Sequence, residues 1–131
     1  MSVVADTSIW VEYLRGGRRA GTSTLDDLLE AGEIVFCGPV CAELLAGASA
    51  EQRDELAELF ASLPWADLDR EGWRTVGEVA ARLRQNGESV PLTDIAIAAA
   101  AVAHGAAVWT RDSDFRRIAG ALTELDLYDA A

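Results

Sequence analysis

The sequence predicts a single α/β domain, a three-layer α/β/α sandwich around a mostly parallel sheet. Short apolar runs alternate with longer segments of helical periodicity along the whole chain, and this alternation is typical of parallel sheets covered by helices. The chain has 131 residues, 50% of them hydrophobic, which suits one compact domain with a real core. We expect that domain to span residues 1–131.

The first half of the chain is expected to hold strands at 2–5 and 34–36 and helices at 7–14, 23–30, 39–45 and 51–63. Glycines at 16–17 and 32 end the first two helices. Pro39 and Gly47 flank the third helix, because proline suits a first turn and glycine suits the position after the last. The inward side chains expected on the first helix are Ile9, Trp10, Tyr13 and Leu14. Those on the fourth are Leu56, Leu59, Phe60 and Leu63.

The second half is expected to hold strands at 65–68, 106–109 and 125–128 and helices at 71–85, 93–104 and 113–118. The helix at 71–85 carries an apolar stripe at helical spacing. Its expected inward side chains are Trp73, Val76, Ala80 and Leu83. The helix at 93–104 is rich in alanine and apolar nearly all round, so we expect it to be buried.

Carboxylates stand where these elements meet. Asp6 and Asp112 follow strands, Asp94 opens a helix, and Glu43 lies one turn into another among small and apolar residues. In parallel sheets, ligands gather where strands end and helices begin, so the four segments can converge on one pocket. Each aspartate could instead be a helix N-cap. Capping does not account for Glu43, and the joint pattern therefore favours a site.

Clustered carboxylates repel one another and need a cation among them. All 11 basic residues are arginine, so no lysine can fill that role and a metal is the economical choice. Oxygen ligands select hard ions, here Mg²⁺ or Mn²⁺, and such sites usually act on phosphate. The hydroxyls of Thr7, Ser8 and Thr110 could orient a water there. With a metal facing the phosphate, the net charge of −11 does not exclude a nucleic-acid substrate.

The remaining sequence features point to a cytoplasmic protein without a membrane segment. Cys37 and Cys41 stand with a single histidine, too few ligands for a zinc site, so we expect free thiols. The start of the chain lacks the basic leader of a signal peptide. The longest apolar run, 95–103, is far shorter than the roughly 20 residues that span a bilayer.

Three stretches of the chain resemble PIN-domain ribonucleases, specifically the VapC-type toxins of bacterial toxin–antitoxin pairs. They are VVADTSIWVEYLRG, PVCAELLAG and VPLTDIAIAAAAVAHGAAVWTRDSDFRRI. The last is the most specific, because a helix that opens on LTD is followed by a strand and TRDSDF. The resemblance spans nearly the whole chain.

This resemblance implies a PIN-like α/β/α fold and an endoribonuclease that depends on magnesium or manganese. The family's acidic quartet, both catalytic and metal-binding, falls on Asp6, Glu43, Asp94 and Asp112. Asp114 matches the aspartate of the family's Asp-Phe pair, and Ser8 matches a hydroxyl that often supports a metal-bound water.

The resemblance also implies partners. VapC-type toxins are silenced by a small antitoxin whose basic C-terminal segment wraps the toxin and often places an arginine near the acidic pocket, and they form homodimers. RNA would be held by the metal and by grouped arginines, for which the candidates are Arg15, Arg18, Arg19, Arg111, Arg116 and Arg117. Ordinary solvated surface charges remain the alternative for these arginines.

Two other enzyme classes fit poorly. A haloacid-dehalogenase phosphatase needs a second aspartate where this chain has Ser8, and a response-regulator receiver needs a lysine. The alternative that stays open is a catalytically weak PIN-like module that binds RNA or a protein without cutting it.

Overall fold

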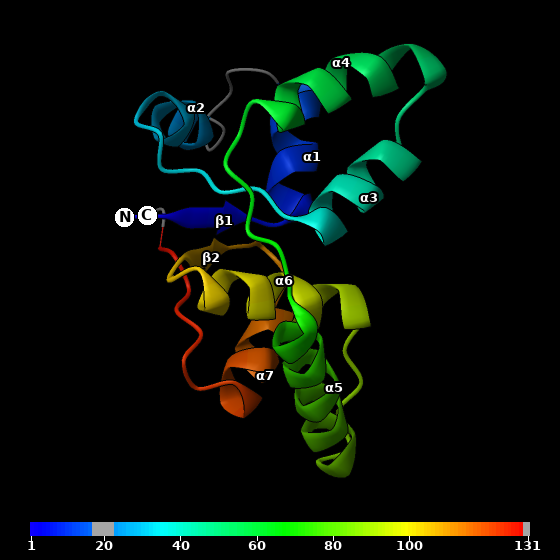
Figure 1. The fold of residues 1–131 in the computed structure, drawn as a ribbon, viewed down its shortest axis with the longest axis vertical. Helices are drawn as coiled ribbons and strands as arrows, with labels where there is room; N and C mark the ends of the chain where they lie inside the picture. The colour runs from blue at the N-terminus through cyan, green and yellow to red at the C-terminus, as the bar shows by residue number, and fades with distance from the viewer. Residues whose placement is uncertain (17–22, 130–131) are drawn as a thin grey trace.

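The computed structural model describes residues 1–16 and 23–129. At its centre two parallel strands, β1 (Val3–Ala5) and β2 (Ala107–Trp109), pair in the register Val3 to Ala107. Helices cover both faces of this sheet (Figure 1). The predicted three-layer α/β/α arrangement around a parallel sheet is therefore confirmed.

The sheet continues on both sides through extended segments that the sequence marked as strands. The predicted strands at 34–36, 65–68 and 125–128 are present only as isolated parallel bridges. The segment 34–36 makes two, Val3–Ile34 and Phe36–Trp65, and the segment 125–128 makes one, Val108–Leu127. Val35 donates to the Val3 carbonyl on one side (2.9 Å) and Phe36 to the Pro64 carbonyl on the other (2.8 Å). The segment at 34–36 therefore joins β1 on one side to the chain around residue 65 on the other.

One helical layer contains α1 (Thr7–Gly16), α2 (Ser23–Glu30), α3 (Gly38–Ala46) and α4 (Ala50–Ala61). Beneath it lies an aromatic cluster in which Trp10 meets Phe36 and Phe60 edge to face, with ring centroids 5.6 and 5.8 Å apart. Phe36 and Phe60 stack at 4.2 Å. The Trp10 ring is fully buried, and its Nε1 is without a hydrogen-bond partner among the described residues.

The other layer contains α5 (Arg70–Gln85), α6 (Leu92–Ala103) and α7 (Asp114–Ala121). Helix α6 lies against the sheet and contacts α5 and α7 (Figure 1). Its residues 95–101 are all buried, as its alanine-rich sequence predicted. None of the described helices combines the length and apolar character needed to cross a bilayer.

Two side chains predicted to face inward are exposed. Leu14 is 41% exposed, because it borders an open groove between α1, α3 and α4 instead of the core. Trp73 is 55% exposed. The buried stripe of α5 starts one turn later, at Val76, and continues through Val79 to Leu83, so the part of the helix that carries Trp73 precedes its packed region.

Candidate active site

Asp6 is the one charged residue that is buried in the described part of the chain, with 4% of its surface exposed. It directly follows β1, and both of its carboxylate oxygens accept hydrogen bonds. Oδ1 accepts from the Ser8 hydroxyl at 2.5 Å and from the Ile9 N–H at 3.2 Å, and Oδ2 accepts from the Thr110 hydroxyl. The bond from Ile9 caps α1, so capping and a site role coexist in this residue.

Two hydroxyls join the end of β1 to the end of β2. The Thr110 oxygen donates to Asp6 and accepts from the Asp112 N–H at 2.9 Å. The Ser8 oxygen accepts from the Arg111 N–H at 3.3 Å. The Asp6 carboxylate and the loop that carries Asp112 are therefore held in one network.

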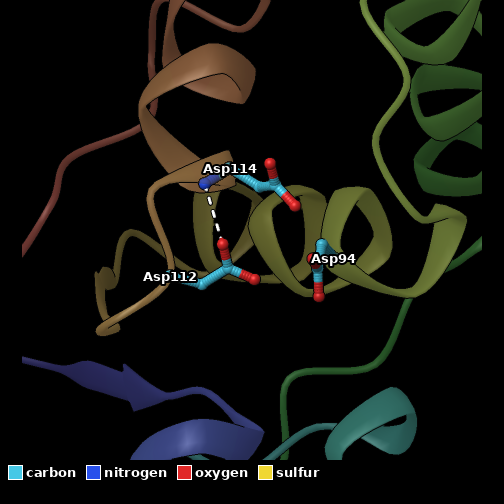
Figure 2. A group of neighbouring side chains, drawn as sticks. All are labelled: Asp94, Asp112 and Asp114. Carbon is cyan, nitrogen blue, oxygen red and sulfur yellow. Dashed lines mark hydrogen bonds between the residues drawn. The ribbon is translucent and has the colours of Figure 1, made fainter.

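Three carboxylates gather beside this network. One oxygen each from Asp94, Asp112 and Asp114 lies within 4.8 Å of the others, an arrangement that could hold a metal ion. Figure 2 shows the three side chains pointing toward one another, with the Asp114 N–H bonded to Asp112 Oδ1 at 2.9 Å. Asp94 comes from the first turn of α6, where Pro91 occupies the N-cap position without a side-chain bond. Capping thus does not explain Asp94.

The electrostatics of Asp94 show how closely the acids converge. Burial and, in decreasing order of size, the charges of Asp112, Glu43, Asp6 and Asp114 together raise the pKa of Asp94 to about 6. All four segments named from the sequence therefore reach one electrostatic environment. No basic side chain of the described residues offsets this shift at Asp94, and a group of hard oxygen donors with uncompensated charge fits Mg²⁺ or Mn²⁺.

Glu43 lies on α3, exposed, and its Oε1 accepts a hydrogen bond from the Thr7 hydroxyl at 2.7 Å. It raises the pKa of Asp94, yet neither it nor Asp6 belongs to the three-carboxylate group. The structure thus separates the acids into a group of three oxygens able to meet one ion and two flanking carboxylates with hydroxyl partners. Asp114, predicted as a supporting residue, lies in the group itself.

The nearby cysteines are free thiols, as predicted. Cys37 precedes α3, and burial raises the pKa of its thiol to about 12. It is therefore uncharged at neutral pH.

Two of the arginines predicted to hold RNA are engaged within the chain. Arg111 makes a bidentate ion pair with Glu12, with Nε–Oε2 and Nη2–Oε1 distances of 2.6 and 3.0 Å. Arg117 pairs with Asp114. The sequence reasoning missed Glu12, although its position four residues after Ser8 places both on one face of α1.

The other predicted arginines differ in their surroundings. Arg15 is exposed on α1 and borders the groove that also contains Glu43. Arg116 is exposed on α7. Arg18 and Arg19 lie outside the described residues.

Comparisons with known proteins agree with this geometry. The PIN domain family model matches residues 3–121. The chain is 35% identical to Ribonuclease VapC11 of Mycobacterium tuberculosis over 122 residues, 89% of this chain and 91% of the relative. It is 37% identical to Ribonuclease VapC32 of the same organism over 117 residues, 84% of each chain. The solved structure of VapBC2 from Rickettsia felis, bound to a promoter DNA fragment, superposes with a TM-score of 0.80 at 25% identity over 100% of both chains.

Proposed function

The chain belongs to the PIN-domain family, and on that premise we propose that it is a metal-dependent endoribonuclease, the toxin of a toxin–antitoxin pair. Its relatives are ribonucleases by name. The observation that carries the proposal is the group of three carboxylates, from Asp94, Asp112 and Asp114, with Asp6 and Glu43 beside it.

The oxygens of Asp94, Asp112 and Asp114 would hold the proposed ion. A divalent cation supplies positive charge to phosphate oxygens and lowers the pKa of water, which is the chemistry that hydrolysis of a phosphodiester needs. The protein's own contribution is position. Because Ser8 and Thr110 fix both oxygens of Asp6, that carboxylate presents a fixed negative charge to the site.

Glu43 is the flexible member of the proposed site. Its exposed side chain is held by one hydrogen bond, from Thr7. It can therefore move toward a bound ion or accept a proton from an attacking water without breaking a buried network.

The proposed partners follow from the relatives and from charge. The Rickettsia felis structure is a VapBC complex, and by analogy we infer a small antitoxin with a basic C-terminal segment for this chain. A net charge of −11 suits such a partner. A homodimer and a cytoplasmic location, where RNA and an antitoxin would be met, complete the proposal.

The test uses purified protein and total bacterial RNA, with Mg²⁺, with Mn²⁺ and with EDTA. We expect cleavage by the wild type with metal and none with EDTA. Asp94→Asn and Asp6→Asn should each abolish cutting, and Asn caps a helix about as well as Asp, so Asp6→Asn should remain folded. The matched control is Glu58→Gln, which removes one exposed charge from α4 and should cut normally.

Two results would contradict the proposal. Equal cleavage by all variants would identify a contaminating nuclease. Absence of cleavage in every sample, with RNA still bound, would establish the binding module in place of the enzyme.

A further inference from the structure

A cleft of about 920 Å³ opens beside the three-carboxylate group. Its walls come from the end of β2, the loop before α7, the first turn of α2 and the C-terminal segment at 127–129. Thr110 and Asp112 line the cleft and also belong to the acidic site. The cleft and the site are therefore continuous, and a polymer cut at the site must pass into neighbouring space on each side of the cut.

One wall of the cleft is aromatic. Tyr128 is partly exposed there, and its ring packs edge to face on Trp109, with centroids 5.7 Å apart and planes at 62°. Trp109 is 3% exposed, so it serves as a rigid support that holds the tyrosine ring. A ring held in this way can stack on a nucleobase with little loss of side-chain freedom, and stacking on an aromatic ring tolerates any base.

The lining of the cleft also includes one available cation. Arg111 and Arg116 both line the cleft, but Arg111 is held by Glu12 through two hydrogen bonds. Arg117, the next residue, is held by Asp114. Among the described residues, the guanidinium of Arg116 alone in this run of arginines makes no ion pair. Ser113 adds a hydroxyl to the lining of the same cleft.

We propose that this cleft is a nucleotide subsite for single-stranded RNA, in which Tyr128 stacks on one base and Arg116 binds a phosphate next to the scissile position. The inference rests on the proposed nuclease function and adds where the strand lies. The volume falls in the range of about 300–1,000 Å³ that small-molecule sites occupy. The cleft is lined by Arg111 and Arg116 as well as by Asp112 and Asp129, so base stacking on Tyr128 would supply binding that does not depend on the net charge of −11.

The first test measures the charge contact. A fluorescent 12-nucleotide RNA of randomised sequence is titrated with protein in EDTA, where the nuclease is silent, at several salt concentrations. Arg116→Gln should weaken binding, and its plot of log K against log salt should be shallower by about 0.7, the value for one phosphate contact on a single strand. Arg53→Gln, an equal loss of charge on the exposed face of α4, should leave both quantities unchanged.

The second test measures stacking. Tyr128→Leu keeps an apolar side chain against Trp109 but removes the ring face, and it should weaken binding roughly fivefold to hundredfold. Its salt dependence should match that of the wild type, because no charge is lost. Thermal unfolding of both variants checks the fold. Phe is the rescuing substitution, since Tyr128→Phe keeps the ring and should bind like the wild type.

The possible results distinguish a wrong subsite from a wrong nuclease function. If the wild type cuts RNA while Arg116→Gln and Tyr128→Leu bind and cut as it does, the subsite is wrong and the nuclease stands. If the variants lose only the binding of a protein partner, the cleft is a protein-docking site and the inference is overturned. RNA binding lost in both variants, without metal and with the fold intact, supports the subsite even where cleavage is absent.

Discussion

The aromatic cluster and the acidic site lie close together in the chain, at Trp10 on α1 and at Asp6 just before that helix, yet they affect stability in opposite ways. In the cluster, Trp10, Phe36 and Phe60 are fully or almost fully buried and contact one another, so burial and ring contacts both stabilise the fold. In the site, burial and the like charges of neighbouring carboxylates raise the pKa of Asp94. The aromatic cluster therefore stabilises the fold, whereas the acidic site destabilises it because its residues are arranged for chemistry.

The largest expected effect is on the stability that the aromatic cluster provides. Phe36→Ala should lower the free energy of unfolding by about 3–5 kcal/mol, because it removes a ring that stacks on Phe60 and leaves a cavity. Urea denaturation followed by circular dichroism measures the change. Trp73→Ala, a ring of the same class that is 55% exposed, is the control and should stay within about 0.5 kcal/mol. Equal losses in both would mean that the cluster is not the centre of the core.

The next prediction concerns the acidic site. Asp94→Asn should reduce the RNA cleavage rate at least about a hundredfold, since a lost ion is worth several kcal/mol of transition-state stabilisation. The rate is measured on a fluorescence-quenched RNA substrate at saturating Mn²⁺. The same variant should be no less stable than the wild type. A variant that is inactive because it unfolds would assign Asp94 a structural role instead.

The third prediction concerns the hydroxyl that links the two strand ends. Thr110→Val keeps the side-chain shape but leaves Asp6 Oδ2 and the Asp112 N–H without their partner, and this should cost about 1–3 kcal/mol. Cleavage should fall as well. Thr110→Ser restores the hydroxyl and should recover activity more fully than stability, because serine lacks the methyl group. Failure of serine to rescue cleavage would show that the methyl group, not the hydrogen bond, matters.

The smallest expected effect is the pH dependence of stability that Asp94 produces. The pKa of Asp94 rises from its ordinary 3.8 to about 6 on folding, so the folded protein binds this proton more tightly than the unfolded chain. Without metal, the contribution that protonated Asp94 makes to the free energy of unfolding is therefore lost as pH rises from about 4 to 6. The loss is complete above that range. Relative to Asp94→Asn, the wild type in EDTA should lose roughly 1–2 kcal/mol between pH 4 and pH 7, after allowance for solvent screening of a half-buried group. A constant difference across this range would contradict the shift.

Much of the fold could be read from the sequence because its signals are local. Glycine and proline mark helix ends, and the alanine-rich stretch at 93–104 predicts a buried helix. The strands beside the central pair were harder to predict. The segment at 34–36 has strand-like residues, but its pairing on both sides depends on neighbours that lie far away in sequence. Trp73 was misplaced because periodicity does not reveal where a helix stops packing against its neighbours.

The site was predictable at the level of residue type and place. Asp6, Asp94 and Asp112 lie at element ends of a parallel fold, where convergence is expected, and Glu43 lies inside α3. The sequence could not reveal which oxygens meet. Asp114 joins Asp94 and Asp112 in the three-carboxylate group, while Asp6 is held by hydroxyls. Such a division depends on side-chain directions and long-range hydrogen bonds, which residue spacing does not encode.

We propose that the acidic site binds a cation, and that the ion relieves the electrostatic repulsion among the carboxylates. Thermal unfolding of the wild type and Asp94→Asn at pH 7.5, with Mn²⁺ and with EDTA, tests it most directly. Mn²⁺ at about a hundred times its dissociation constant should stabilise the wild type by about 2.7 kcal/mol, a rise of several degrees in Tm, and should leave Asp94→Asn nearly unchanged. Equal shifts in both proteins, or none in the wild type, would contradict the claim.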